Sequence, residues 1–201
     1  MEKLSALLEN TAETIEDADA ALVEKVAPSD KAAVQALSLI GEIGDQPPMR
    51  ALCASIIIFG LIRRDAKLTL AGVRMLTAHT IATKAKNVLK KRVDRVRPEA
   101  REGEDDHRVK AGVSASHDET SFPSGHSAGA LAVGAAFGRA FPEHKAAAVG
   151  SATTIALLQV PRRSHYLSDV IVGSAIGLAC EGALNRLIQG LGLSGRRRRA
   201  E

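Results

Sequence analysis

The chain of 201 residues is long enough for one domain with a substantial hydrophobic core and too short for two. Aromatic residues make up only 2% of the chain and Trp is absent, so a core must be built from Ala, Leu, Val and Ile, which favours closely packed helices over a β-rich fold. The net charge of +4 raises the question of nucleic acid, but no aromatic residues interleave with the basic run and no nucleic-acid-binding motif occurs, so that partner class is set aside.

The first segment, residues 1–28, predicts an amphipathic helix. Between Leu4 and Val26, apolar residues recur at roughly the spacing of one helical face, with acidic residues around the rest. Pro28-Ser29-Asp30 then indicates a stop followed by the cap of a new helix. We expect the first helix to lie on the protein surface or along an interface, and we find no secretory signal in it.

Residues 29–195 form the predicted main domain, in which apolar helical stretches alternate with polar turns. The predicted fold is all-α, a bundle of about six core helices, with a long polar loop at residues 98–123. The expected helices cover about residues 32–43, 49–62, 68–89, 126–141, 146–160 and 169–193. Residues 196–201 form a basic tail, which we expect to bind anionic lipid at the end of the last helix.

The core helices are predicted to span a membrane. A spanning helix needs about 20 mostly apolar residues, and the best stretch, residues 120–138, contains no Asp, Glu, Lys or Arg. The Lys and Arg residues of several turns satisfy the positive-inside rule if both termini are cytoplasmic. The expected location is the inner membrane of a bacterium, with the functional site on the periplasmic face. A mean hydropathy near zero leaves a soluble helical bundle as the alternative.

The first of three clusters with functional potential is basic. Lys90 is followed, after six residues, by Arg97 and Pro98. The planar guanidinium of arginine matches phosphate oxygens, and lysine acts as a movable point charge. Taken alone, this cluster is more simply the basic end of a helix.

The second cluster, Pro123-Ser124-Gly125-His126, stands where a loop turns into a helix. Free backbone N–H groups at the start of a helix, together with the helix dipole, form an anion site. His126 would project from that first turn, where it could protonate a leaving oxygen. The same residues are also ordinary turn formers.

The third cluster is His165-Tyr166-Leu167-Ser168-Asp169. Residues four apart share one face of a helix, so the His165 ring and the Asp169 carboxylate can touch. Such a carboxylate fixes the tautomer of the imidazole and stabilises the charge that builds up when the other ring nitrogen attacks phosphorus.

In this order and spacing, the clusters resemble the signature of the type 2 phosphatidic acid phosphatase superfamily: Lys-x6-Arg-Pro, Pro-Ser-Gly-His and Ser-Arg-x5-His-x3-Asp. The resemblance covers about residues 41–182. It implies an all-helical fold and hydrolysis through a phosphohistidine, without metal or cofactor. The roles that it implies are His165 as nucleophile, Asp169 as its orienting partner, His126 as general acid, and Lys90, Arg97, Ser124 and Gly125 as phosphate-binding residues.

One element departs from the signature. Leu158 and Gln159 stand where the family has Ser-Arg, so one phosphate-binding arginine is missing. The loss of one fixed cation lowers a rate by roughly 10²-fold or more, and reduced activity is therefore expected. Arg162 and Arg163 follow closely and are the candidates to replace it.

The predicted function is that of a membrane phosphatase acting on a lipid phosphate or diphosphate, such as phosphatidate, phosphatidylglycerol phosphate, an isoprenyl diphosphate or a lipid A phosphate. The expected partners are thus the lipid substrate and the membrane. Two alternatives stay open: a non-catalytic lipid-phosphate-binding protein, motivated by Gln159, and a soluble member resembling acid phosphatases or haloperoxidases. His107 and His117 lie beside acidic residues, but no metal-ligand spacing is recognisable there.

Overall fold

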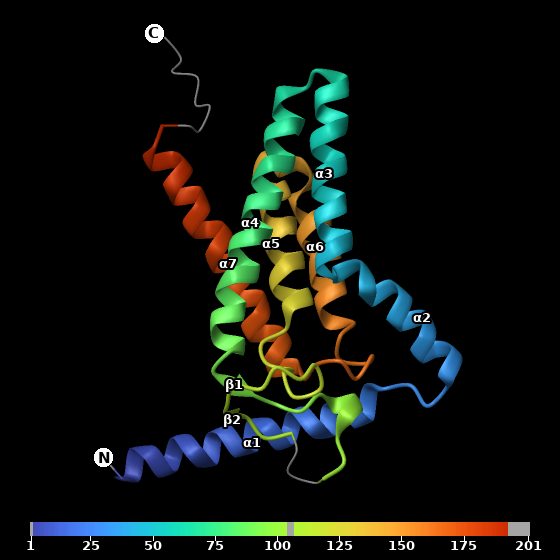
Figure 1. Cartoon of the computed structure of the whole chain (residues 1–201), viewed down its shortest axis with the longest axis vertical. Helices are drawn as coiled ribbons and strands as arrows, with labels where there is room; N and C mark the ends of the chain where they lie inside the picture. The colour runs from blue at the N-terminus through green and yellow to red at the C-terminus, as the bar shows by residue number, and fades with distance from the viewer. Residues whose placement is uncertain (1, 104–106, 193–201) are drawn as a thin grey trace.

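A computed structural model of the chain describes residues 2–103 and 107–192, and the predicted basic tail, residues 196–201, lies outside them (Figure 1). The α-helices are α1 (Glu2–Val26), α2 (Lys31–Gly41), α3 (Gln46–Arg63), α4 (Ala66–Lys90), α5 (Gly125–Ala140), α6 (Lys145–Leu157) and α7 (Leu167–Gly190). Short 3-10 turns are η1 (Glu42–Gly44), η2 (Pro98–Ala100) and η3 (Pro142–His144). The strands β1 (Val93–Asp94) and β2 (Lys110–Ala111) pair antiparallel in the loop layer. The helical class predicted from the sequence is confirmed.

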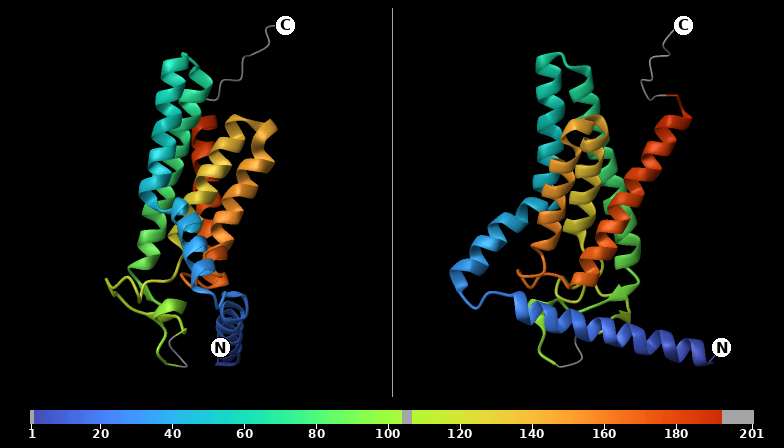
Figure 2. Two further views of the ribbon diagram at one scale, coloured as in Figure 1. Left: turned by 90° about the vertical axis from the view of Figure 1, so that its right-hand side faces the viewer. Right: turned by 180° about the vertical axis from the view of Figure 1, so that it is seen from behind.

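Helix α5 is the centre of the bundle. α4, α6 and α7 pack along it, and α3 packs against α4 (Figures 1 and 2). Most α5 residues from Ser127 to Gly138 are buried, and many are Ala or Gly, so neighbouring helices approach closely. The charge-free stretch that best predicted a membrane span is therefore the core helix. Among the described residues, α7 is the helix long and apolar enough to cross a membrane by length and composition.

Five of the six expected core helices form the bundle, and the expectation of six was wrong for α2. That helix projects away from the bundle (Figure 1), and its Leu39 side chain is 72% exposed. The reason is local: the η1 turn ends α2, and Pro47 and Pro48 then start α3 in a new direction, because proline at the first helical positions begins a helix.

Helix α1 crosses the lower end of the bundle, beneath the start of α7 (Figures 1 and 2). The predicted apolar face is not buried as a whole: Val23 is buried, but Leu7 and Ile15 are more than half exposed. A polar contact holds the helix instead, since the backbone N–H of Ser168 donates to the carboxylate of Asp19 at 3.1 Å.

The described residues of the chain begin and end at opposite ends of the bundle (Figure 1). α1 lies at the end where α7 begins, whereas α7 runs along the bundle and finishes at the other end. An odd number of helices, α3 to α7, connects the two. If all five of these helices span a membrane, α1 and the end of α7 lie on opposite sides of it. The expectation of two cytoplasmic termini went with a count of about six core helices, α2 among them, and it stays a prediction.

A buried carboxylate in α7 is neutralised by two other helices. Glu181 is 1% exposed and accepts hydrogen bonds from Arg74 of α4 and, at 2.6 Å, from Nε of Arg139 of α5. Both cations therefore offset the cost of burying this charge inside the bundle.

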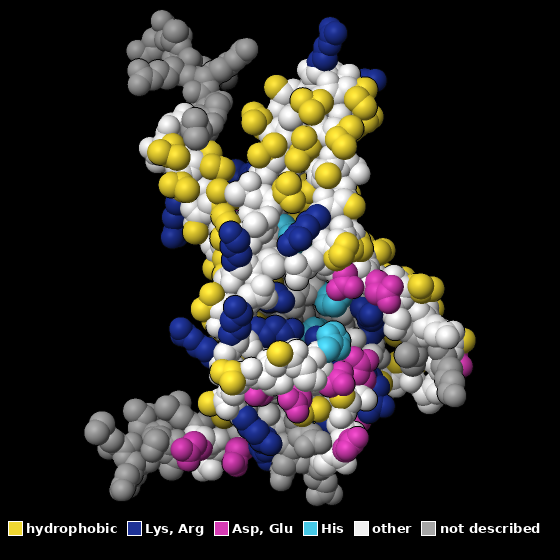
Figure 3. All heavy atoms as spheres, viewed as in Figure 1, with side chains coloured by type: hydrophobic (Ala, Val, Ile, Leu, Met, Phe, Trp, Pro, Cys, Tyr) yellow, Lys and Arg dark blue, Asp and Glu magenta, His cyan; other side chains and the backbone are white. Residues whose placement is uncertain are grey.

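Large hydrophobic side chains cover the outside of the bundle along its length (Figure 3). On α3, α4 and α7 they include Ile58, Phe59, Leu61, Ile62, Leu70, Val73, Ile81, Ile171, Leu178 and Leu187, each more than a third exposed. Contiguous apolar surface of this extent marks a protein or membrane interface.

The crossing of α7 over α5 depends on two glycines. A Cβ atom built on Gly173 would lie 2.4 Å from the carbonyl oxygen of Ser124, and one on Gly177 would lie 2.3 Å from that of Ala128. Only glycine allows the backbones to approach so closely. The close crossing brings the starts of α5 and α7 side by side.

We predict that Gly177→Ala lowers the free energy of unfolding by about 1–3 kcal/mol, because the new methyl group meets a backbone oxygen that cannot move without shifting α5. The matched control is Gly182→Ala on the same helix, where a Cβ meets nothing within 4 Å. That change should stabilise the protein by roughly 0.5–1 kcal/mol, through better helix propensity. Thermal unfolding in detergent checks both, and equal effects would contradict the proposed crossing.

Candidate active site

A pocket of about 190 Å³ lies where the bundle meets the loop layer. Figure 3 shows Lys, Arg and His side chains gathered around a hollow at this level of the molecule. The lining residues are Gly44, Asp45, Gln46, Lys86, Lys90, Arg97, His117, Gly125, His126 and His165. Five predicted site residues, from all three sequence clusters, are therefore brought together here. A larger cavity of about 490 Å³ between α4 and α7 contains none of them and is mostly apolar.

His165 and Asp169 meet at a helix start rather than along a helix. α7 begins at Leu167, and Tyr166 is its N-cap, so His165 precedes the helix. The Asp169 carboxylate, in the first turn, accepts a hydrogen bond from the Tyr166 backbone N–H at 3.0 Å. Nδ1 of His165 lies 3.6 Å from Oδ2 of Asp169. The predicted pair is formed, by a capping arrangement and not by a shared helix face.

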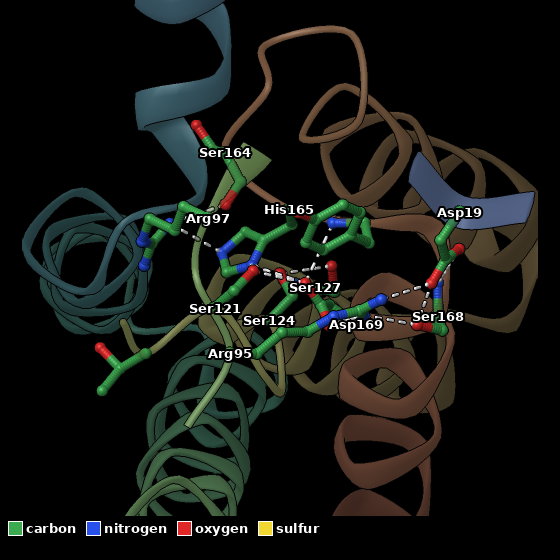
Figure 4. A network of polar contacts seen from close by, with 12 residues as sticks. Asp19, Arg95, Arg97, Ser121, Ser124, Ser127, Ser164, His165, Ser168 and Asp169 are labelled. Carbon is green, nitrogen blue, oxygen red and sulfur yellow. Dashed lines mark hydrogen bonds and ion pairs between the residues drawn. The ribbon is translucent and has the colours of Figure 1, made fainter. Parts of the chain in front are cut away.

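The Asp169 carboxylate is 0% exposed and is surrounded by donors (Figure 4). Nη1 of Arg95 donates to Oδ1 at 2.7 Å, and the Ser121 hydroxyl donates to Oδ2 at 2.5 Å. The same Arg95 guanidinium pairs with Asp19 of α1 at 3.1 Å and stacks over the Tyr166 ring. α1 is thus connected to the site through one buried arginine.

The Arg97 guanidinium lies beside the His165 ring (Figure 4), and both residues line the pocket. It donates to the carbonyl oxygens of His117 and Ser164, both at 2.9 Å, and its Nη1 lies 3.4 Å from Nε2 of His165. Arginine has no acceptor atom, so this contact requires a lone pair on Nε2. The proton of the neutral ring is then on Nδ1, facing Ser121 and Asp169.

Burial lowers the pKa of His165 to about 3. The ring is 1% exposed, and desolvation disfavours its charged form more than the neighbouring Asp169 favours it. The imidazole is therefore neutral near neutral pH, which is the form that can act as a nucleophile.

His126 faces His165 across the pocket, with ring centroids 6.0 Å apart. Its Nε2 lies 2.8 Å from Oδ1 of Asp45, and this contact lowers the pKa of Asp45. Asp45 is free for this role because the next helix positions include Pro47 and Pro48, which lack the N–H groups that an N-cap side chain accepts from.

The two other residues of the second cluster differ in their roles. Ser124 is 0% exposed, and its hydroxyl oxygen accepts from the backbone N–H and the hydroxyl of Ser127, so its side chain caps α5 instead of lining the pocket. Gly125 lines the pocket. Its N–H and that of His126 begin the helix and have no intrahelical acceptor.

Neither candidate replacement for the missing arginine lines the pocket. Gln159 is 0% exposed and its amide donates to the Ile155 carbonyl oxygen at 3.0 Å. Arg162 donates to the Gln159 side chain at 3.1 Å, and Arg163 is exposed with a positive φ of 61°.

Sequence reasoning missed several residues of this site. Lys86 stands one helical turn before Lys90, and that spacing was the available signal. For Asp45, the signal was an N-cap residue followed by two prolines. His117 was set aside as part of a polar loop, yet it lines the pocket, and the Arg97 charge lowers its pKa. Nothing local in the sequence pointed to Arg95 or Asp19, which meet only in the folded chain.

Within residues 2–103 and 107–192, no group of three or more His, Cys, Asp or Glu side chains is arranged to hold a metal ion. His107, weighed above as a metal ligand, lies 2.8 Å from Asp17 of α1. The acidic residues 105 and 106 of the same loop lie outside the described residues.

Comparisons with known proteins give one family. The model of the PAP2 superfamily, the family of type 2 phosphatidic acid phosphatases, matches residues 51–192. A lipid A 1-phosphatase of Rhizobium etli is 33% identical over 112 residues, which cover 53% of this chain and 45% of that protein. A lipid A 1-phosphatase of Rhizobium johnstonii is 44% identical over 57 residues, 28% of this chain and 23% of that protein. The alignments thus span less than half of either relative.

Two solved structures share the fold. Aquifex aeolicus LpxE has a TM-score of 0.62 at 20% identity, over 82% of this chain and 93% of its own. The transmembrane PAP2-type phosphatidylglycerolphosphate phosphatase of Bacillus subtilis has a TM-score of 0.66 at 22% identity, over 92% of this chain and 90% of its own.

The lowered pKa of His165 predicts a pH dependence of stability. Unfolding returns the ring to a pKa near 6.5, so between pH 4 and 6 the unfolded chain binds about one more proton at this residue than the folded chain. As pH falls through this window, His165 should therefore lower the unfolding free energy by about 1.4 kcal/mol per pH unit.

Denaturant unfolding in detergent at pH 4, 5 and 6 measures this slope. His165→Asn should remove that part of the slope, whereas His144→Asn, at an exposed histidine in the turn before α6, should leave it unchanged. Equal slopes for the wild type and His165→Asn would contradict a neutral, buried His165.

Proposed function

Because this chain belongs to the PAP2 superfamily, we propose that it is a membrane phosphatase that hydrolyses a lipid phosphate monoester or diphosphate through a phosphohistidine, without a metal ion. The observation that carries the proposal is the pair of histidines across the pocket. Nε2 of His165 lies 3.4 Å from Nη1 of Arg97, and Nε2 of His126 lies 2.8 Å from Oδ1 of Asp45. One ring is set up as a nucleophile and the other as an acid.

In the proposed reaction, Nε2 of His165 attacks phosphorus, and an N–P bond forms while the P–O bond to the lipid breaks. The leaving alkoxide takes the proton from His126. A water molecule, deprotonated by His126, then attacks the phosphohistidine, which releases inorganic phosphate and restores His165. Asp169 stabilises the positive charge that the His165 ring acquires in the first step.

Charge in the pocket supports phosphate as the substrate group. Phosphoryl transfer depends mainly on positioning and on stabilising charge at the phosphoryl oxygens. Lys90 and Arg97 line the pocket as cations, and Gly125 brings the N-terminus of α5 to it. The proposed phosphate contacts are these two side chains and the N–H group of Gly125, with Ser124 acting as the cap that orients that helix start.

The apolar surface of α3, α4 and α7 supports a location in a membrane, as does the name of the Bacillus subtilis protein. We propose that α3 to α7 cross the bilayer. The turns at the far end carry Arg63, Arg64, Arg139 and Lys145, so by the positive-inside rule that end is cytoplasmic. The pocket and α1 are then at the periplasmic face of a bacterial inner membrane.

The relatives guide the choice of lipid. Two carry the name lipid A 1-phosphatase and one the name phosphatidylglycerolphosphate phosphatase. A phosphorylated glycolipid and a phosphorylated glycerolipid are therefore the first substrate classes to test.

We predict that detergent-purified protein releases inorganic phosphate from lipid A, phosphatidylglycerol phosphate or short-chain phosphatidate in excess EDTA. His165→Ala should release none, because the nucleophile is gone. The loss should exceed about 10³-fold, the usual scale for removing a group that forms a covalent intermediate. His144→Ala, at an exposed histidine of the far end, is the matched control and should retain full activity.

Phosphate release that stops in EDTA and returns with a divalent cation would contradict the metal-independent mechanism. Binding of the phosphorylated lipids by wild type without any release would instead favour the non-catalytic lipid-phosphate-binding protein. Recovery of the protein in the soluble fraction without detergent would contradict the membrane location.

A further inference from the structure

The family signature contains an arginine that this chain lacks. At its place, the Gln159 side chain is turned away from the pocket, toward the carbonyl oxygen of Ile155 and the side chain of Arg162. Arg162 in turn packs against Gly41, where a Cβ would lie 2.2 Å from its Nη1. Gln159 and Arg162 therefore belong to the contact between α2 and the end of α6, and neither lines the pocket.

Lys86 places a further cation in the pocket. It lies on α4 one turn before Lys90, so both side chains leave the helix on the same face. The Lys86 side chain lines the pocket and is 6% exposed. Its Nζ approaches the start of α5, because a Cβ built on Gly125 would lie only 3.0 Å from it.

The Lys86 ammonium has no protein partner to account for its burial. Within residues 2–103 and 107–192, no carboxylate lies within ion-pair distance of Nζ, and no hydrogen bond to it is formed. Asp45, the carboxylate among the described residues that line the pocket, is paired with His126. The Lys86 side chain is mostly shielded from water and has no carboxylate partner among the described residues, so an anion bound in the pocket would stabilise its charge.

We propose that Lys86 binds the phosphoryl group as the third fixed cation, in place of the arginine that Gln159 replaces. The inference deepens the proposed phosphatase function and rests on it. A phosphoryl oxygen held by the N–H group of Gly125 lies against Nζ of Lys86, while Lys90 and Arg97 contact the others. The charge lost at one position of the sequence is thus restored from another helix, and full activity is expected despite Gln159.

Position 125 also fits this role. Because Gly125 has no side chain, the Lys86 ammonium can lie directly against the helix start, where the dipole and the free N–H groups attract an anion. A larger residue would separate the lysine from these groups.

Lys86→Met tests the proposal, since methionine keeps most of the length and apolar volume and removes the charge. We expect turnover of the lipid phosphate to fall by about 10²-fold or more. Lys84→Met is the matched control, because Lys84 is exposed on the same helix, and it should behave like the wild type. Lys86→Gln should repeat the loss if the charge is what matters.

A second readout does not depend on catalysis. Inorganic phosphate that binds only the folded protein stabilises it by RT ln(1 + L/Kd), where L is the phosphate concentration, so the Tm rises with phosphate concentration. Phosphate and orthovanadate should raise the Tm of the wild type and of Lys84→Met, and should raise that of Lys86→Met much less. Without phosphate, Lys86→Met should be at least as stable as the wild type, because an unpaired buried charge is removed.

The role of Lys86 would be overturned if the wild type is active and both Lys86→Met and Lys86→Gln keep turnover within about twofold of it. In that case the two variants would also show the full phosphate-induced rise in Tm. A wild type that binds phosphate through Lys86 but releases none from any lipid would overturn the phosphatase function and leave the anion site standing. The two failures are therefore distinguishable.

Discussion

The structure of the site depends on one buried charge, the carboxylate of Asp169. An ion at 0% exposure is tolerated only when donors surround it. Those donors come from separate segments: Arg95 from the loop after α4, Ser121 from the loop before α5, and the backbone N–H of Tyr166 from the start of α7. Satisfying this carboxylate therefore fixes the loops relative to the bundle and orients the His165 ring.

The need to neutralise Asp169 also connects the N-terminal helix α1 to the site. Arg95 lies between Asp169 and Asp19, so its charge is shared by a carboxylate of the site and a carboxylate of α1. Residues 1–50 lie outside the match to the family model. They nevertheless supply Asp19 to this network and Asp45 to the pocket. The bundle provides the close crossing of α5 and α7, and residues 1–50 add the two carboxylates that complete the polar contacts of the site.

Helix positions could be predicted from the sequence because apolar periodicity and turn formers mark them locally. All seven α-helices were expected within a few residues of their bounds. The packing of α2 could not be predicted from the sequence, because nothing in the sequence of a helix says whether a neighbouring helix covers it. The expected topology depends on this helix: counting α2 in the bundle places both chain ends on one face, whereas α3 to α7 alone run between α1 and the end of α7. Apolar periodicity predicts where the helices are, but how many of them join the bundle depends on tertiary packing.

The site was predictable where a motif holds its residues and not where separate segments meet. Lys90, Arg97, Gly125, His126 and His165 all line one pocket. Ser124, in contrast, caps α5, since the hydroxyl of an N-cap serine is used by the helix itself. Lys86 and Asp45 were missed because a lysine on a basic helix and an aspartate before a helix have ordinary local explanations.

The measurement that tests the central claim most directly is a chemical quench of the enzyme during turnover of a ³²P-labelled lipid phosphate. If Nε2 of His165 attacks phosphorus, wild-type protein carries label that is stable in alkali and lost in acid, as expected of a phosphohistidine, and His165→Ala carries none. Label on His165→Ala, or steady turnover by the wild type with no labelled protein at any quench time, would contradict the account.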